Sequence, residues 1–557
     1  MYKRKYWLAK YVVVLWIIFF MGSGCSQRPD NVLPTRAVKA EAVSLPVATM
    51  TIVPTWTPVP TAEPTTIAVR AGVPGQLVAQ VQTLINQQPG FMWRGGSEGD
   101  IILGVNVGQP IATWIYAVVA PFTELADEVA AADLRASWEG RGERPLLLSP
   151  NSAAAISRLW GEPSEQVQIV DANELVATAW AQRAVWVIMP FDQVTPDMKL
   201  LVVDGVDLLR PEERLDEYPL QLTIGILSGQ GGGGQAVSKF MSYWPGRVTN
   251  RDPRAFTEVA MTGVTALTRA TAWTMERKGI AYPAEEVGEV LQAADVTHIS
   301  NEVSFNPACP APNPAGGTSF CSADEYFELL QLVGTDVVEL TGNHVNDYGA
   351  EHLTHSIELY ERAGMVYFGG GRNQIDSAEA AVVTHNGNRI AFVGCNPVGP
   401  RYAWATAEAA GSQPCSGDYL ENYIQELAAE GYVVIATIQY WEHYSYGPTP
   451  QQVVDFKALA AAGAAAVSGS QGHHAQGFAF HEGAFIHYGL GNLFFDQMQM
   501  LGTRQTFVDR YIIYDGRLLN VRLWTGLIED YARPRVMSRE ERTDFLRTVF
   551  AYTDWEP

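Results

Sequence analysis

Several apolar runs in the second half of the chain end in polar side chains of three kinds: carboxylates, imidazoles and amides. Carboxylates and imidazoles bind divalent cations and transfer protons near neutral pH, whereas neutral amides are weak ligands suited to orienting oxygen atoms. The residues in question are Asn301 and Glu302, Asn343 and His344, Gln439 with Glu442 and His443, Gln471 with His473 and His474, and Asn492.

Taken singly, each of these positions has an ordinary structural interpretation. A polar residue at a strand end usually caps the next turn, and an isolated His is usually part of a hydrogen-bonded structure. Several such ends in one domain favour a shared pocket, because the carboxyl ends of neighbouring parallel strands lie along one edge of the sheet. We therefore expect one pocket lined by Glu302, Asn343, His344, Gln439 and His473.

The elements that must position these residues alternate between helix and strand patterns from about residue 255 onwards. Helices are predicted over 283–294, with Pro at the first turn, over 351–363 before Gly364, and over 451–462. A capping box at 322–325 predicts a further helix that Gly334 ends. Strands are predicted at 296–300, 336–340, 432–438, 464–468 and 485–488, with hairpin turns at Asn386-Gly387 and Asp515-Gly516.

An earlier α/β region, residues 69–250, carries no catalytic constellation. It has a helical pattern near 76–87 and strand-like runs at 101–107 and 184–189. The glycines at 231–234 lack the Gly-Lys-Ser/Thr of a phosphate loop, which favours a flexible turn.

Short strings in this region, at 118–122, 134–140 and 218–220, resemble bilobal periplasmic phosphate-binding proteins. The resemblance implies a solute-binding ancestry for the region. Retained solute binding and loss of binding are both compatible with it.

The first 25 residues have the pattern of an export signal. A basic start precedes a short apolar run at 11–21 and then Gly-Ser-Gly-Cys25. The run is shorter than the about 20 residues of a permanent span, and the stretch resembles a bacterial lipobox with Gly22 where Leu is usual. We expect lipidation at Cys25 and a membrane-anchored, extracytoplasmic protein, with an uncleaved anchor as the alternative. Residues 26–68 are rich in Pro and Thr and predict an extended linker.

Four further cysteines agree with export, since an even number outside the cytosol suggests disulfides. Three pairings are possible, and each close pair brackets an irregular loop. We favour Cys309 with Cys321 and Cys395 with Cys415. A zinc site is disfavoured because no pair has the spacing of a zinc knuckle.

Composition and net charge limit the number of globular units and the class of partner. The chain has 557 residues, 47% of them hydrophobic and 18% charged, which is enough apolar material for several globular units. Its formal net charge of −22 would repel a polyphosphate backbone, so nucleic acid is not an expected partner.

Four segments occur in the order found in the CapA family, also called the poly-γ-glutamate synthesis family. They lie at 342–349, 439–444, 469–476 and 487–496, and the resemblance extends over about 258–497 of a domain spanning 255–557. The resemblance implies a four-layer α/β/β/α sandwich similar to calcineurin-like metallophosphatases, with a metal site at the strand ends. It also implies a role in making, exporting or anchoring an extracellular anionic polymer, with the polymer or its synthesis machinery as partner.

Two elements match the family well. Asn301-Glu302 is similar to its Asn-Leu-Glu element with one residue missing, and Asn343-His344 with Asp347 matches its Asn-His-x-x-Asp element. These two elements would place a carboxylate and an imidazole at the expected site.

Other positions depart from the family. Val264 stands where a bridging Asp is usual, Gln439 stands where a His-Trp-Gly element has its His, and Gln471 replaces the first His of a His-Pro-His element, which leaves His473. A two-metal hydrolase needs about six to eight firm ligands. One divalent ion is therefore feasible, on the candidate ligands Glu302, Asn343, His344 and His473, whereas two ions are not expected.

Two functional hypotheses follow. In the first, the domain processes or binds a polymer as a metallophosphatase-like hydrolase or amide-transferring enzyme. Glu302, His344 and His473 are its catalytic candidates, and the substrate-binding candidates are Asn301, Asn343, Gln439, Glu442, Gln471 and Asn492. In the second, the protein is a non-catalytic binding or scaffold lipoprotein with a degenerate pocket.

Overall fold

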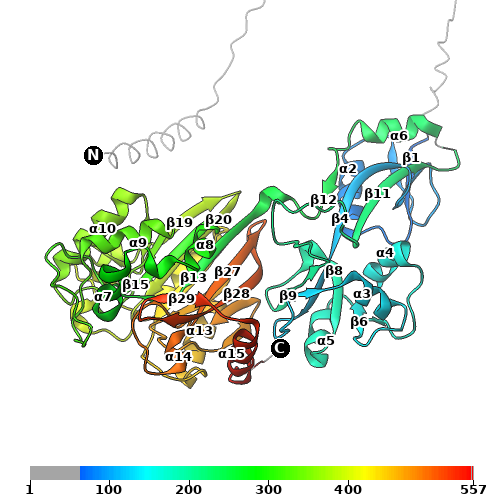
Figure 1. Ribbon diagram of the computed structural model, residues 1–557. Coiled ribbons are helices and arrows are strands. Elements are labelled where there is room, and N and C mark those ends of the chain that lie inside the picture. Colours follow the sequence, from blue (N-terminus) through cyan, green and yellow to red (C-terminus); the bar gives the residue numbers. More distant parts are fainter. Residues whose placement is uncertain (1–62, 232, 554, 556–557) are drawn as a thin grey trace, which may run out of the picture. The chain divides into compact units, whose positions relative to one another are not determined.

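The computed structural model describes residues 63–231, 233–553 and 555 (Figure 1). The predicted export signal, the lipidation site at Cys25 and nearly all of the linker lie outside these residues. Within the described part of the chain, no helix has the length and apolar character needed to cross a bilayer.

The first region, residues 63–250, is built around a ten-stranded mixed sheet. Its long central strand β4 pairs with β11, β8, β9 and β12, so that a single strand holds both halves of the sheet together. The strands are β1 (Thr65–Val69), β2 (Phe91–Trp93), β3 (Ile101–Val105), β4 (Gln109–Pro121), β6 (Leu146–Leu148), β7 (Gln168–Ile169), β8 (Trp186–Pro190), β9 (Met198–Leu200), β11 (Gln221–Ser228) and β12 (Val248–Thr249).

Five α-helices cover this sheet, and the predicted helix near 76–87 is present as α2, which buries Leu77, Val81 and Ile85 at helical spacing. The strand-like runs correspond to β3 and β8. The helices are α2 (Gly75–Asn86), α3 (Ala131–Trp138), α4 (Pro150–Trp160), α5 (Leu175–Gln182) and α6 (Gly233–Met241).

The C-terminal domain contains two larger sheets. Figure 1 shows β13 and β15 beside β27 and β28, although these strands come from opposite ends of the domain sequence. The nine strands of one sheet are β13 (Phe256–Thr262), β14 (Val264–Thr265), β15 (Val296–Asn301), β16 (Val337–Glu339), β17 (Val366–Phe368), β26 (Asn492–Phe494), β27 (Gln505–Tyr514), β28 (Arg517–Glu529) and β29 (Arg533–Val536). The six strands of the other are β19 (Ala381–His385), β20 (Asn388–Cys395), β22 (Val433–Gln439), β23 (Ala466–Ser470), β24 (Phe478–His481) and β25 (Ala484–His487).

Apolar residues from both sheets share one core. Val296 and Val337 of the first sheet belong to the same buried cluster as Phe392 and Ile435 of the second. A separate cluster joins the first sheet to its helices, and another joins the second sheet to α12 and α13. The helices are α7 (Arg269–Lys278), α8 (Val287–Gln292), α9 (Phe327–Leu332), α10 (Ala350–Ala363), α11 (Gln374–Ser377), α12 (Tyr419–Ala429), α13 (Pro450–Ala461), α14 (Leu501–Arg504) and α15 (Arg539–Ala551).

Local signals located most of these elements. Helix α10 ends at Gly364 in the left-handed conformation, with φ of 81°, and the predicted turn at Asn386-Gly387 joins β19 to β20 with φ of 48° and 82°. Both elements are as predicted. Helix α13 has a Thr449–Gln452 capping box at its start that the sequence interpretation did not use.

Two predicted helices are present only in part. The capping box at 322–325 does not form, since Ser322 bridges Phe305 in an extended segment, but a 3₁₀ turn at Asp324–Tyr326 leads directly into α9. The helix predicted over 283–294 is divided into a short 3₁₀ turn, Tyr282–Ala284, and the six-residue α8.

Both predicted disulfides are present in the C-terminal domain. Cys309 pairs with Cys321 and Cys395 with Cys415, with Cα–Cα distances of 5.8 and 5.2 Å. Each closes the irregular loop between its two cysteines.

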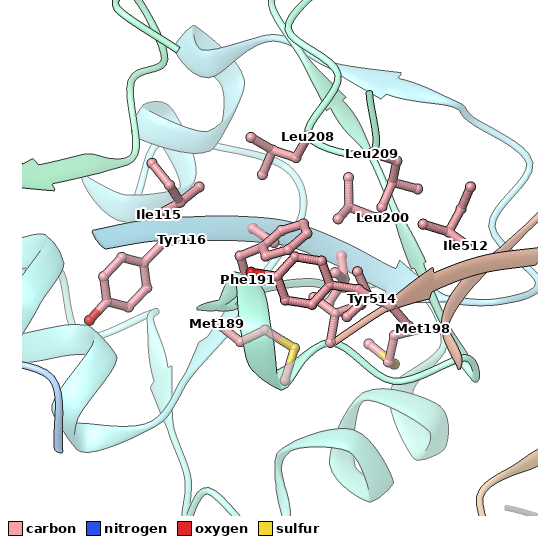
Figure 2. Packing of buried hydrophobic residues seen from close by; sticks show 14 of the residues in the cluster. Ile115, Tyr116, Met189, Phe191, Met198, Leu200, Leu208, Leu209, Ile512 and Tyr514 are labelled. Carbon is pink, nitrogen blue, oxygen red and sulfur yellow. The ribbon is translucent and has the colours of Figure 1, made fainter. Parts of the chain in front are cut away.

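The first region packs directly against the C-terminal domain through aromatic side chains. Figure 2 shows Phe191 next to Tyr514, and their ring centroids lie 5.2 Å apart. Phe122 contacts the rings of Phe478, Phe480 and Phe485 at 5.3–5.7 Å. These contacts give the two regions a continuous core.

Candidate functional site

The candidate site lies where strands of both sheets of the C-terminal domain end. Glu302 directly follows β15, and Asn343 and His344 follow β16, its parallel neighbour. In the other sheet, Gln439 is the last residue of β22, and Gln471 follows the parallel β23. The parallel order of the strands therefore brings residues together that are far apart in the sequence.

Gln439 is the centre of a buried amide cluster. Its Nε2 donates to Glu302 Oε1 at 2.9 Å and to Asn343 Oδ1 at 3.2 Å, and it also contacts Gln471 Oε1. Ser470 Oγ donates to Gln439 Oε1 at 2.8 Å, which fixes the orientation of the amide. The Gln439 amide nitrogen thus contacts one oxygen of a carboxylate and the oxygens of two other side-chain amides.

Glu302 is 2% exposed, and its second oxygen, Oε2, has no hydrogen-bond partner in the described part of the chain. A buried carboxylate oxygen without a donor is unfavourable by about 1–3 kcal/mol or more. A proton on Glu302 Oε2, or a hydrogen bond donated to it by a ligand, would remove this unfavourable term.

His344 forms a pair with Asp347 at 2.7 Å, between His344 Nδ1 and Asp347 Oδ2. Asp347 also accepts from the backbone N–H of Phe320 and from the hydroxyl of Tyr402. Burial alone would lower the pKa of His344, but the hydrogen bond to Asp347 and the charges of Glu302 and Glu442 outweigh it, so the pKa is raised. The imidazole is therefore held more readily in its protonated form.

His473 is fixed on the other side of the cluster. Its Nδ1 lies 2.7 Å from Asn492 Oδ1, and its Nε2 lies 3.7 Å from Glu442 Oε1. The ring stacks on Phe495 with centroids 5.2 Å apart. Gln471 Nε2 donates weakly to the same Glu442 oxygen at 3.4 Å.

Sequence analysis missed Arg269 and Asp496, which form a bidentate ion pair beside the site. The guanidinium lies over the rings of Phe320 and Phe495, 4.8 Å from each centroid. Arg269 has a left-handed backbone, with φ of 46°, a strained state for a residue with a side chain. Asp496 ended one of the quoted segments, but nothing in the sequence indicated its partner.

Two of the predicted site residues do not join the cluster. Asn301 Nδ2 donates to the Val303 carbonyl at 2.9 Å and to the Tyr360 hydroxyl at 2.7 Å, so its amide nitrogen is engaged with Val303 and α10. Its Oδ1 has no partner among the described residues, and the expected substrate-binding role of Asn301 stays a prediction. His474 packs against Tyr446, and burial lowers its pKa.

Two buried pairs lie inside the sheets and were not predicted as such. His298 Nε2 and Glu339 Oε2 are 3.3 Å apart, and His487 Nδ1 is 2.6 Å from Asp509 Oδ2. Thr341 Oγ1 donates to Glu339 and contacts Ser470 Oγ at 3.2 Å, which links the first pair to the Gln439 amide. Their only sequence signal is a His within an apolar strand.

The donor set does not fit a two-metal centre. No group of three His, Cys, Asp or Glu side chains in the described residues is placed to hold an ion. Val264, where the family has a bridging Asp, is buried between β15 and β26, and the Gln439 amide already donates to the oxygens of Glu302 and Asn343. The single-ion site on Glu302, Asn343, His344 and His473 stays a prediction.

Comparison with known proteins shows a likeness to one family. Residues 258–497 match the model of the bacterial capsule synthesis protein PGA_cap, a range that includes every residue of the cluster. The C-terminal domain is therefore similar to the CapA family over these residues. Over 178 residues the chain is 30% identical to the capsule biosynthesis protein CapA of Bacillus anthracis, covering 31% of this chain and 43% of that protein. Over 174 residues it is 24% identical to the PGA biosynthesis protein CapA of Bacillus subtilis strain 168, covering 31% and 46%.

The chain thus spans less than half the length of these two curated relatives. Among solved structures, a phosphate transport receptor from Vibrio cholerae aligns with 32% of this chain and 93% of its own, at 11% identity and a TM-score of 0.28. So low a score supports no conclusion about the first region, and its solute-binding ancestry stays a prediction.

Proposed function

We propose that this protein is an extracytoplasmic, membrane-anchored CapA-like protein that takes part in the synthesis, export or anchoring of an extracellular polymer such as poly-γ-glutamate. The observation that carries the proposal is the family match over 258–497, together with relatives named for capsule and PGA biosynthesis. The export pattern before Cys25 and the two disulfides support a location outside the cytoplasm. Its partner would be the polymer or the machinery that makes it.

The proposed architecture is the four-layer α/β/β/α sandwich of the metallophosphatase type. It is supported by the core that the two sheets share and by the separate clusters that join each sheet to its own helices. In such a fold the loops after the parallel strands are free to vary, and here those loops carry Glu302, His344 and His473.

If the domain is catalytic, His344 is the natural proton donor. The Asp347 carboxylate holds its ring and favours the charged form. Glu302 is the natural proton acceptor, since one of its oxygens has no partner. Such a pair suits hydrolysis or transfer of an amide bond.

A second candidate function is a non-catalytic scaffold, and the amide cluster favours it. The direct contacts of Gln439 with Glu302, Asn343 and Gln471 stabilise the strand ends by themselves. Val264 removes the carboxylate that the family uses at the same place.

Deletion and complementation in the source organism test both candidates. Loss of surface polymer after deletion, restored by the full-length chain, is expected. Failure of His344→Ala and Glu302→Gln to restore the polymer would favour catalysis, and full restoration by both would favour the scaffold. Unchanged surface polymer after deletion would refute the proposed function, and metal analysis of the purified chain would test the single ion.

A further inference from the structure

A cavity of about 150 Å³, which we call the loop cavity, lies between the disulfide-closed loop 309–321 and the start of α7. It is smaller than the roughly 300–1,000 Å³ of pockets that hold drug-sized ligands, so it suits one small chemical group. The Cys309–Cys321 disulfide forms part of its wall, and its polar lining includes Thr268, Arg269, Asn313, Ser319 and Tyr348.

Several polar side chains of the loop cavity are free to donate hydrogen bonds. Thr268 is 8% exposed, and its hydroxyl does not cap the N-terminus of α7 or bond to any other described group. The hydroxyls of Ser319 and Tyr348 also lack a partner in the described part of the chain. Asn313 accepts from the backbone N–H of Ala315 through Oδ1, which leaves its Nδ2 unused. The cavity therefore offers donors to a ligand that carries acceptor oxygens.

Arg269 adds a positive charge to these donors. Its Nε and Nη2 bond to Asp496, and its Nη1 has only the Gly317 carbonyl, at 3.5 Å. A guanidinium carries five N–H donors, so two of them remain, and the side chain is 21% exposed. No Asp or Glu lines the cavity among the described residues, although the whole chain has 60 of them. A positive group without a lining carboxylate favours an anion.

The loop cavity lies next to the strand-end site. The Arg269 guanidinium is 4.8 Å from the ring centroids of both Phe320 and Phe495. Phe320 in turn contacts the His344 ring, with centroids 4.3 Å apart, and Phe495 stacks on His473 at 5.2 Å. A group held by Arg269 is therefore one aromatic side chain away from each imidazole of the site.

We propose that the loop cavity binds a carboxylate group of the extracellular polymer, with Arg269 as its charged partner and the hydroxyls of Thr268 and Tyr348 as further donors. Hydrogen bonds from a guanidinium to a carboxylate are about twice as strong as those between neutral groups. Three prolines and the disulfide restrain the loop 309–321, so this wall of the cavity loses little freedom on binding. The inference rests on the proposed function, because it names the group by which this domain holds an acidic polymer beside His344 and His473.

Calorimetric titration of the purified full-length chain tests the carboxylate site. The probes are a γ-linked oligoglutamate and its amidated counterpart, which has the same length and no carboxylates. We expect the oligoglutamate to bind at least tenfold more tightly than the amidated chain. Inorganic phosphate is the third probe and distinguishes a site for the polymer from a site for a small anion, and it should bind more weakly than the oligoglutamate.

Matched variants locate the binding. Arg269→Lys keeps a cation beside Asp496 but loses the planar guanidinium, and it should weaken oligoglutamate binding at least fivefold, whereas Arg277→Lys, at an exposed position on the same helix, should not. Tyr348→Phe and Thr268→Val remove only a hydroxyl that has no partner, so the fold is kept, and each should weaken binding at least twofold. Tyr243→Phe in the first region is their control, since Tyr243 and Tyr348 are both 41% exposed.

Three results would overturn the proposal: equal binding of the amidated chain, tighter binding of phosphate than of the oligoglutamate, or cavity variants that bind like their controls. Loss of surface polymer on deletion without any oligoglutamate binding would overturn this inference alone and leave the proposed function standing. Unchanged surface polymer on deletion, with oligoglutamate binding that depends on Arg269, would refute the proposed function and leave the carboxylate site standing.

Discussion

The first region and the CapA-like domain are both mixed α/β structures, but they use their buried polar side chains in different ways. In the first region, Asn250 bonds to the backbone N–H and carbonyl of Ile115 and also to Asp192 Oδ1, and Arg251 donates to the backbone carbonyls of Leu208 and Arg210. In the CapA-like domain, Gln439 bonds to other side chains, and Glu302 keeps an unpartnered oxygen. A polar side chain that completes the backbone is structural, whereas a cluster of side chains with an unsatisfied atom indicates a site.

The largest expected effect is at the junction of the two regions. Phe122 is buried and contacts the rings of Phe478, Phe480 and Phe485, so Phe122→Ala should lower the free energy of unfolding by about 3–5 kcal/mol. Chemical denaturation followed by Trp fluorescence measures this loss. Phe91→Ala, whose ring contacts only the first region's Phe240 and Tyr243 among the described rings, is the control and should have a smaller effect. A loss below about 1 kcal/mol for Phe122→Ala would mean that the two regions are energetically independent.

Both disulfides lie in the CapA-like domain, because the first region contains no Cys. The double variant Cys395→Ser/Cys415→Ser frees a loop with a sequence separation of 20 and should be destabilised by about 3 kcal/mol. The pair Cys309–Cys321, with a separation of 12, should contribute about 0.5 kcal/mol less by the same chain-entropy relation. Differential scanning calorimetry with and without reductant checks both values. A transition temperature that reductant leaves unchanged would contradict both contributions.

A salt bridge across the junction predicts a dependence of stability on pH. Asp207 forms a bidentate pair with Arg522, and although its burial opposes ionisation, the guanidinium lowers its pKa. A carboxyl with a lowered folded-state pKa adds stability above its unfolded pKa of about 3.9 and loses it as the pH falls through the folded value. Asp207→Asn should therefore lose about 2 kcal/mol at pH 7, and the difference from wild type should shrink below about pH 4. Urea titrations at several pH values measure the free energy of unfolding of both proteins. A difference between them that stays constant down to pH 2 would exclude the ion pair as the cause.

The smallest expected effect on stability is at the site itself. Glu302→Gln keeps an acceptor for Gln439 and removes a buried charge that has an unpartnered oxygen, so the free energy of unfolding should change by less than about 1 kcal/mol. If the domain is catalytic, the Glu302→Gln variant should nevertheless fail to restore surface polymer in the complementation strain. A large loss of stability would show that Glu302 is a structural group like Asn250, and the contrast between the two regions would disappear.

Local sequence signals located the main strands and helices of the CapA-like domain but not every boundary. The apolar run before Gln439 and the glycine after α10 act over a few residues, so short-range physics predicts them. The capping box at 322–325 does not form because Ser322 bridges Phe305, and the helical turn starts two residues later, at Asp324. The Arg269–Asp496 pair, 227 positions apart, could not be predicted because nothing local connects these residues.

The sequence by itself indicated the likeness to the CapA family, the two disulfide pairings and the strand ends that carry Glu302, Asn343, His344, Gln439 and His473, because each is encoded in a short stretch of residues. Tertiary structure alone decided which polar atoms are satisfied. Asn301 and Glu302 are adjacent, yet the Asn301 amide donates to Tyr360 whereas Glu302 accepts from Gln439, and each keeps one buried oxygen without a partner among the described residues. The reason is physical: a hydrogen bond depends on which groups from distant segments come within about 3 Å, and only the packed sheets and helices fix that distance.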